Sequence, residues 1–188
     1  MIAYKGFSKN LTAKLGKGEF QFKMHETVEE KEAKCANIGF HCAEEPLDVL
    51  RYYSGKDDRY CVVKAEGDIH EDAHGSRISC TKMTLLKEIT LQELAMAECT
   101  FLYNHPFREY SCMVQKDSGE AVTNFVIVRG KNPIAKGREG TNLFFLKEKD
   151  DSVEIIELGA YEVDGKEIRE GIFYDIRGNE VKDDKKGA

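Results

Sequence analysis

The sequence predicts an α+β protein of two modules, with a mixed sheet and two helices at residues 1–108 and an all-β module at residues 109–182. Alternating apolar and polar residues in the first half indicate strands, and two segments there have helix-start signals. After residue 108, glycines recur at short intervals around β-branched residues, without a helical pattern. The charged segment 183–188, DDKKGA, is expected to be a disordered tail.

The composition is that of a globular protein with an acidic balance. Of the 188 residues, 28 are Lys or Arg and 34 are Asp or Glu, so the formal net charge is −6, and 41% of the residues are hydrophobic. This apolar content provides for a core, whereas phosphate-backbone binding needs clustered cations. The start, MIAYKGFSKN, has no apolar signal segment, and no stretch has the length of a membrane span. We therefore expect a soluble cytoplasmic protein that binds neither membranes nor nucleic acid.

The first strand is expected at IAYKGF, because its residues alternate and are rich in aromatic side chains. Phe20 and Phe22 share one face of a second short strand. A helix is expected to begin at Pro46, since proline is favoured in the first helical turn, and to end at Gly55. Its apolar stripe consists of Leu47, Leu50 and Tyr53.

Two long strands and a second helix complete the N-terminal module. The segments YCVVKAEGDI and SRISCTKMTLLKEI have the apolar content of buried strands. Thr90 and Glu93 have the T-x-x-E spacing of a capping box, which predicts a helix start. This helix is expected to end before Pro106, because the residue preceding a proline disfavours the helical conformation.

Turn signals organise the all-β module. The Asp164-Gly165 pair between VEIIELGAYEV and EIREGIFYDI predicts a hairpin that caps the module. Its expected buried face consists of Ile155, Leu158, Ile172 and Phe173. We expect the strand Phe125–Val128 to keep a free edge that pairs with a second copy or packs on the first module. A homodimer is the first of these two alternatives.

The six cysteines are expected to be buried free thiols, because they fall at inward positions of strands and helices and no secretory signal precedes them. They are Cys35, Cys42, Cys61, Cys80, Cys99 and Cys112. The nearest sets of possible metal ligands are Cys35 with His41 and Cys42, and His70 with His74. Neither has the closely spaced ligand pattern of a zinc site, so no metal is expected.

Three segments resemble an uncharacterised domain family of bacteriophages and prophages, namely YKGFSKNLT, GFHCAEEPLDVLRYY and EGDI. The resemblance covers most of residues 1–108. In that family the domain is commonly followed by repeats of the S-A-A-T-N-T-G kind, which resemble the coils of a β-solenoid. GEAVTNFVIV and GKNPIAKG echo this repeat here, so the resemblance implies that short solenoid-like coils accompany the hairpin cap.

The order of the N-terminal motifs also resembles, in outline, the ADP-ribosyltransferase fold. The corresponding residues by position are Lys5 or Tyr4 on the first strand, His41, Tyr53 and Glu88. Such a site would clamp NAD and stabilise an oxocarbenium-like transition state. The Arg or His that this superfamily has on its first strand is missing. The alternative interpretation is that the tyrosines are core aromatics and that Glu88 is a surface residue.

Other chemistry finds little support in the sequence. Cys42 beside His41 suggests a thiolate and its base, but adjacent strand residues point to opposite faces. Phosphate loops, dinucleotide glycine patterns, G-x-S-x-G and H-E-x-x-H are absent. We expect no cofactor, except NAD under the ADP-ribosyltransferase alternative. The leading hypothesis is a phage or prophage accessory protein that binds a host or phage protein, as an anti-CRISPR-like inhibitor of host immunity does.

Overall fold

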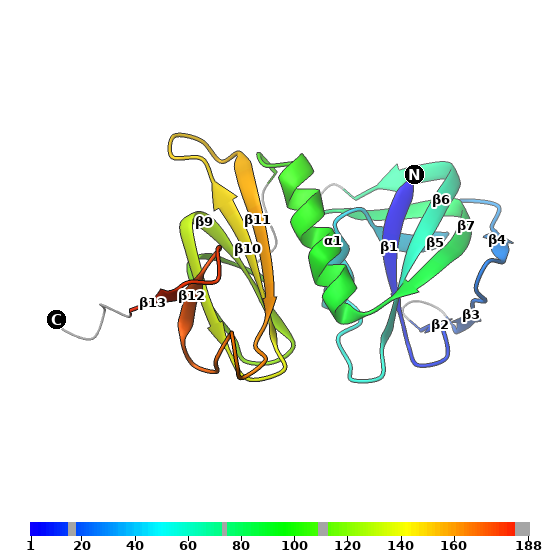
Figure 1. The fold of residues 1–188 in the computed structure, drawn as a ribbon. Coiled ribbons are helices and arrows are strands. Elements are labelled where there is room, and N and C mark those ends of the chain that lie inside the picture. The colour runs from blue at the N-terminus through cyan, green and yellow to red at the C-terminus, as the bar shows by residue number, and fades with distance from the viewer. Residues whose placement is uncertain (15–17, 73–74, 109–112, 183–188) are drawn as a thin grey trace. The chain divides into compact units, whose positions relative to one another are not determined.

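The computed structural model describes residues 1–14, 18–72, 75–108 and 113–182. The chain folds as two compact units, Met1–Leu94 and Ala95–Ala188 (Figure 1). The division falls inside the second helix, whereas the sequence placed a module boundary at residue 108, after that helix. The tail expected at 183–188 lies outside the described residues.

The first unit is a sheet that closes into a ring. β1 pairs antiparallel with β5 on one side and with β6 on the other. β7 pairs with both β5 and β6, which closes the ring, and β4 pairs with β7 outside it. The strands are β1 (Ile2–Phe7), β2 (Thr12–Ala13), β3 (Phe20–Gln21), β4 (Thr27–Glu29), β5 (Phe40–Ala43), β6 (Arg59–Glu71) and β7 (Arg77–Ile89).

The interior of this ring is the core of the first unit. In β1, Ala3 and Phe7 belong to the buried apolar cluster, so the intervening residues Tyr4 and Gly6 point outward. The cluster comprises Ala3, Phe7, Leu11, Phe22, Phe40, Cys42, Cys61, Val63, Ala65, Ile78, Cys80, Met83 and Leu85. Because a closed sheet fills its interior with its own side chains, it does not depend on a covering layer of helices.

The α+β class predicted from the sequence is wrong, because the protein is mostly β. Among the described residues, strands hold 51% and two helices hold 12%. The helix expected at Pro46 is only a 3₁₀ helix, η1 (Pro46–Arg51), whose N-cap residue, Glu45, makes no side-chain capping bond. The physical reason is ring closure, which buries the apolar face that two packed helices would otherwise cover.

The second helix, α1 (Leu91–Asn104), begins where the capping box predicts. The backbone N–H of Thr90 donates to Glu93 Oε2 at 2.8 Å, and that of Glu93 donates to Thr90 Oγ1 at 3.1 Å. The predicted cap is therefore confirmed. Among the described residues, neither helix combines the length and the apolar character needed to cross a membrane.

The second unit contains an open sheet. β8, β9 and β10 pair in parallel without an intervening helix. β11 pairs antiparallel with β10, and β12 pairs antiparallel with β9 and β13. The strands are β8 (Val114–Ala121), β9 (Phe125–Gly137), β10 (Asn142–Glu148), β11 (Ile155–Glu162), β12 (Phe173–Asp175) and β13 (Glu180–Val181).

The turn at Asp164-Gly165 forms, but the hairpin predicted around it does not. Gly165 has a φ of 72°, and the Asp164 carboxylate accepts the N–H groups of Lys166 and Ile168. Beyond this turn, β12 pairs with β9 instead of β11, because the second half of the long strand β9 extends past β10 and offers Ile134 and Ala135 as partners. A turn signal in the sequence indicates where the chain reverses its direction. It does not determine which strand pairs with the strand that follows the turn.

The free edge of the second unit also lies elsewhere than predicted. The segment Phe125–Val128 is the start of β9, which lies between β10 and β8. Its backbone groups are therefore used within the sheet. The strands at the margins of this sheet are β8, β11 and the two-residue strand β13.

Candidate functional site

The residues corresponding to an ADP-ribosyltransferase site lie at separate places in the first unit. His41, on β5, is the cross-strand neighbour of Ser79 on β7. Glu88 lies nine residues further along β7. At a rise of about 3.3 Å per residue, such a segment of strand extends roughly 30 Å. His41 and Glu88 therefore do not face one small-molecule site.

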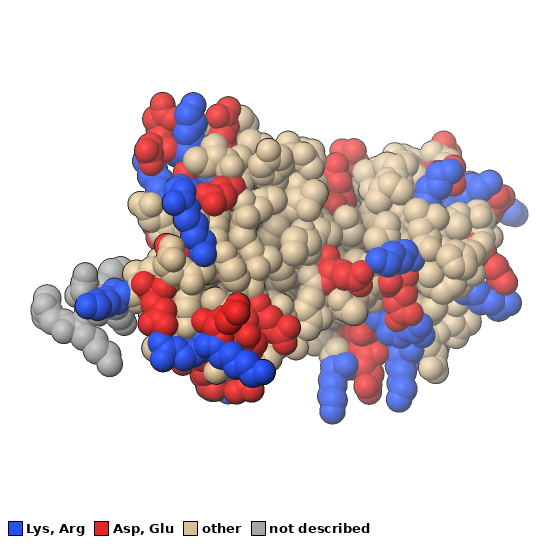
Figure 2. All heavy atoms as spheres, viewed as in Figure 1, with Lys and Arg blue, Asp and Glu red and all other residues tan. Residues whose placement is uncertain are grey.

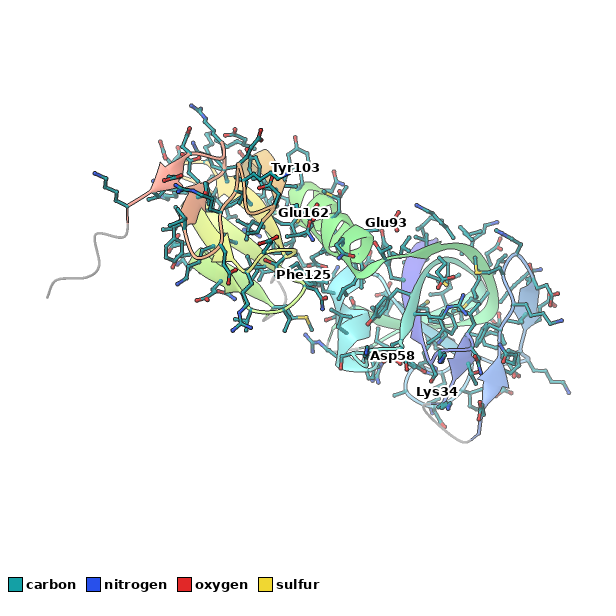
Figure 3. The ribbon with its side chains drawn as sticks, turned by 60° about the horizontal axis from the view of Figure 1, so that its bottom comes forward. Lys34, Asp58, Glu93, Tyr103, Phe125 and Glu162 are labelled. Atoms are coloured by element: carbon teal, nitrogen blue, oxygen red, sulfur yellow. The ribbon has the colours of Figure 1, made fainter. Side chains whose placement is uncertain are left out.

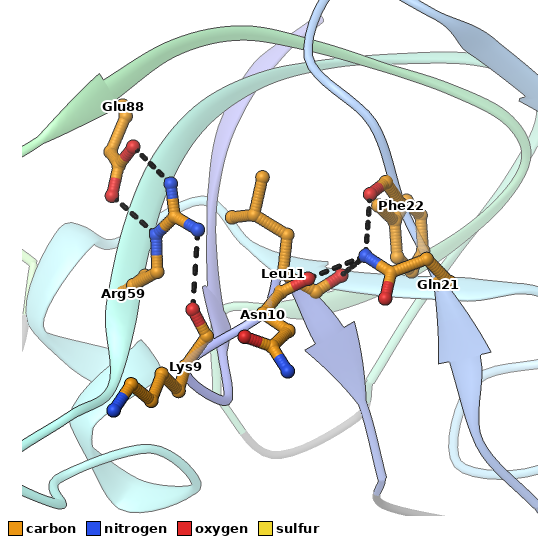
Figure 4. A network of polar contacts seen from close by, with 7 residues as sticks. All are labelled: Lys9, Asn10, Leu11, Gln21, Phe22, Arg59 and Glu88. Carbon is orange, nitrogen blue, oxygen red and sulfur yellow. Dashed lines mark hydrogen bonds and ion pairs between the residues drawn. The ribbon is translucent and has the colours of Figure 1, made fainter.

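Glu88 is held in an ion pair (Figure 4). Arg59 donates from Nε and from Nη2 to the two carboxylate oxygens, each at 2.6 Å, and its Nη1 donates to the Lys9 carbonyl at 3.2 Å. The hydrogen bonds from Arg59 lower the pKa of Glu88. This carboxylate thus stays ionised and joins β7 to β6, while Arg59 also bonds to the segment that follows β1.

Tyr53 is a packing residue just beyond η1. Its ring lies against Gly6 so closely that a Cβ on Gly6 would be 2.6 Å from the Cβ of Tyr53. Its hydroxyl accepts the backbone N–H of Lys14 at 3.3 Å, and its carbonyl accepts the hydroxyl of Tyr60 at 3.1 Å. Because Gly6 points out of the ring, Tyr53 covers the outer side of β1 and is not available to stack on a ligand.

Lys5 is a cation inside the ring. Its Nζ donates to the carbonyl oxygen of His41 at 2.6 Å and lies 5.4 Å and 5.5 Å from the ring centroids of Phe7 and Phe22. Among the described residues, no carboxylate forms an ion pair with it. Desolvation by burial lowers the pKa of Lys5. The amine is therefore enclosed by aromatic rings and backbone and does not form a clamp for phosphate groups.

His41 contacts the amine of Lys5 through its backbone carbonyl oxygen and not through its imidazole. Its Nε2 is buried and has no hydrogen-bond partner among the described residues, and the same holds for the Oγ of the opposite residue, Ser79. Burial lowers the pKa of His41, and the charges of Lys5 and Arg77 act in the same direction. The imidazole is thus neutral at pH 7. In the ranges that the structure describes, no group of three or more His, Cys, Asp or Glu residues could hold a metal ion.

The prediction of buried free thiols is confirmed for Cys42, Cys61, Cys80 and Cys99, while Cys35 is partly exposed. Cys112 and His74 lie outside the described residues. Burial raises the pKa of Cys61 to about 12 and also raises that of Cys99. These two thiols are protonated at neutral pH and lack the thiolate needed of a nucleophile. Cys42 faces the core, away from the imidazole of His41.

The second unit presents apolar side chains to solvent. They form what we call the apolar rim: Phe107, Ile156, Leu158 and Val153, which are 77%, 56%, 44% and 41% exposed. Patches of this kind on otherwise charged proteins mark interaction surfaces.

A buried arginine fixes the two segments of this rim to each other. Arg129 is 1% exposed, and its Nη2 donates to the carbonyls of Pro106 at 2.7 Å and Val153 at 2.8 Å. Its Nε donates to Glu148 Oε1 at 2.6 Å. The turn that carries Phe107 is thereby held beside the residues that lead into β11.

Sequence reasoning missed the apolar rim. The sequence did contain one signal, an arginine directly after the apolar run FVIV, because a cation in a buried strand needs fixed partners. Phe107 had no such signal, since an aromatic residue after a helix is more often a core residue.

The charges in the view of Figure 2 are mixed. Lys and Arg side chains lie interspersed with Asp and Glu side chains, and they form no continuous basic surface on that face. Nucleic-acid binding draws its affinity from clustered cations. The face shown in Figure 2 has no such cluster of cations.

Comparison with protein-family profiles matches residues 1–97 to a domain of unknown function, DUF7666. The matched region contains the first unit and ends within α1. The comparisons with curated proteins and with solved structures found no match. The resemblance of the N-terminal segments to an uncharacterised domain family is thus confirmed at the level of that domain. Since the match spans more than half of its 188 residues, the chain belongs to the DUF7666 family.

Proposed function

We propose that this protein acts by binding another protein through the apolar rim of its second unit. The observation that supports this most is Phe107, an aromatic side chain that is 77% exposed. Arg129 ties the preceding residue, Pro106, to the sheet, so Phe107 is presented from a fixed turn. Rigid aromatic side chains of this kind are the usual anchors of protein interfaces. The apolar rim lies outside the matched domain, which ends at residue 97.

A catalytic function has less support. The carboxylate of Glu88 is engaged by Arg59, and Tyr53 is packed against Gly6. An NAD-dependent transferase would need these groups to converge on one cleft, because positioning is the main contribution of such a site. Titration calorimetry with NAD is expected to show no binding. A saturable heat signal that disappears in a Glu88→Gln variant would favour the enzyme instead.

In a more specific form of this proposal, the protein inhibits the immune defence of a bacterial host. On this hypothesis the chain is a phage or prophage accessory protein in the cytoplasm of a bacterial host, where it occupies a basic surface of an immunity complex. The net charge of −6 and the resemblance of the N-terminal segments support it. Charge complementarity would speed the encounter and orient the two proteins.

The test is affinity capture from a bacterial host lysate with the full chain as bait. Phe107→Ala removes the anchor, and Ile38→Ala serves as the matched control because Ile38 is an exposed apolar residue of the first unit. We expect one specific protein to be captured by the wild type and the control and to be lost with Phe107→Ala. Capture of chaperones and ribosomal proteins alone, or equal capture by all three baits, would contradict the proposal.

A further inference from the structure

The outer edge of β11 is open to another strand. β11 pairs with β10 on one side, and within the described part of the chain its other edge has no partner strand. Alternate residues Ile156, Leu158 and Ala160 are exposed on one face. An edge strand with unpaired backbone groups and apolar side chains is a template for strand addition.

The opposite margin of the same sheet is protected. β8 exposes Gln115, Lys116 and Glu120 along its length. It also has a break in register after Lys116, where Asp117 adopts a φ of 61°. Charged side chains and bulges are the usual means of blocking edge pairing. The pairing of β11 also shifts in register, but only at its start between Ile155 and Glu157, so its regular stretch from Glu157 to Glu162 lacks the mid-strand bulge of β8.

The negative charge of the β11 region indicates which kind of strand can pair with its outer edge. Residues 150–165 include six Asp or Glu and neither Lys nor Arg. Glu157, on the inner face of β11, and Glu162, at its end (Figure 3), form no ion pair with any described residue. A second copy paired at this edge would bring like charges together, which destabilises paired strands. A strand with basic residues would neutralise them.

We propose that β11 accepts an extended basic and apolar segment of a partner protein as an added strand. This rests on the proposed function, protein binding, and identifies its partner chemistry. The apolar residues of the segment pack on Ile156 and Leu158, next to the turn that carries Phe107. Its Lys or Arg residues alternate with these and face Glu157, with a further one at Glu162.

The experiment uses the full chain and an eight-residue peptide of alternating valine and lysine as the probe, with a valine–glutamate peptide for comparison. Binding is measured by fluorescence anisotropy, and hydrogen exchange of residues 155–162 reports whether the backbone becomes paired. The test variant is Ile156→Lys with Leu158→Lys. The matched control, Gln115→Lys with Ser118→Lys, adds the same charge to the exposed positions of β8.

We expect the basic peptide to bind the wild type and the β8 control, to slow exchange across 155–162, and to bind the β11 variant at least ten-fold more weakly. The acidic peptide should not bind. Equal weakening in the two variants, or binding without slower exchange at 155–162, overturns the proposal. So does a wild-type dimer that the β11 variant dissociates in sedimentation, because the occupant is then a second copy.

Different outcomes would contradict the two proposals, protein binding and strand addition at β11. If the protein captured from the lysate by the wild type is also captured by the β11 variant, protein binding stands and the strand-addition site is wrong. If the basic peptide binds β11 but no specific protein is captured, the strand-addition chemistry stands and the proposed function is wrong.

Discussion

The sheets of the two units differ in whether their edge strands are paired. In the first unit, β6 returns to β7 and closes a ring, so the long strands have neighbours on both sides. In the second unit the sheet stays open, with β8, β11 and the short β13 at its margins. The matched family domain is thus the closed unit, while the binding surface that we propose belongs to the open one. Closure removes edges, and an open sheet must either protect them or use them.

The units also differ in how they hold a buried cation. Lys5 has a backbone carbonyl and two aromatic rings as neighbours, whereas Arg129 has a carboxylate and two carbonyls. The surroundings of Lys5 accommodate its charge, whereas the charge of Arg129 joins three segments, those of Pro106, Glu148 and Val153. Four predictions test this comparison.

The largest effect is expected for Arg129→Met. It leaves the carboxylate of Glu148 and two carbonyls without their donor, which should destabilise the second unit by about 3–5 kcal/mol. Urea unfolding followed by hydrogen exchange in β9 and β10 measures this. Lys136→Met, which breaks an ion pair with the half-exposed Glu120, is the control and should cost less than about 1 kcal/mol. Similar losses in the two variants would contradict a joining role for Arg129.

Lys5→Met should stabilise the first unit at pH 7 by roughly 1–3 kcal/mol, the scale for replacing a buried charge by an apolar side chain. Because burial lowers the pKa of Lys5 from 10.5, the unfolded chain binds more protons between the folded pKa and 10.5. The contribution of this residue to stability therefore rises with pH in that window.

The measurement is urea unfolding of the wild type and Lys5→Met from pH 7 to pH 10. The advantage of the variant should be greatest at pH 7 and shrink as the pH approaches 10.5. The difference between the two proteins cancels the titration of a cysteine that does not interact with Lys5, such as Cys99. Lys9→Met, at an exposed lysine, should show no such trend. A pH-independent advantage would mean that the pKa of Lys5 is the same in the folded and unfolded protein.

Two buried serines of the first unit should respond with opposite signs. The Ser79 hydroxyl is fully buried without a partner, so Ser79→Ala is expected to stabilise the first unit by about 1 kcal/mol. The Ser76 hydroxyl donates to Asp48 Oδ2 at 2.7 Å, so Ser76→Ala should destabilise it by about 1–2 kcal/mol. Thermal melts of both variants test the pair. Destabilisation by Ser79→Ala would show that its hydroxyl has found a partner.

The smallest effect concerns the helix that begins at the junction of the units. Thr90→Ala removes a capping hydroxyl and should cost about 1 kcal/mol in a urea melt. Thr100→Ala is the control, because its hydroxyl bonds only to the Met96 carbonyl within the helix and should change stability by less than about 0.5 kcal/mol. A loss no larger than the control would indicate that the helix start is stabilised by packing alone.

The sequence predicted the local elements better than their assembly. The capping box at Thr90, the strand Ile2–Phe7 and the turn at Asp164-Gly165 were correct because each depends on residues close together in the chain. The fold class was wrong because ring closure depends on β6 meeting both β1 and β7. Alternation within a strand shows which face is buried and leaves its neighbours undetermined.

The candidate site shows the same limit. The residues His41, Tyr53 and Glu88 were chosen by their order in the chain, and order does not fix distance. The surface suited to a partner depends on Phe107 and Ile156, which are apolar residues left outside the core. No pattern in one sequence separates an exposed apolar residue of this kind from a buried one.

Ring closure has a further consequence, for the order of folding. Ile2 pairs with Lys64 across the ring, a separation of 62 residues, whereas Phe125 pairs with Asn142 only 17 residues away. Closing the longer loop costs about 1 kcal/mol more in chain entropy, and distant contacts slow folding. Pulse-labelled hydrogen exchange should show β9 and β10 protected before β1. The half of the chain that is synthesised last then forms its central strand pair before the first half closes its ring.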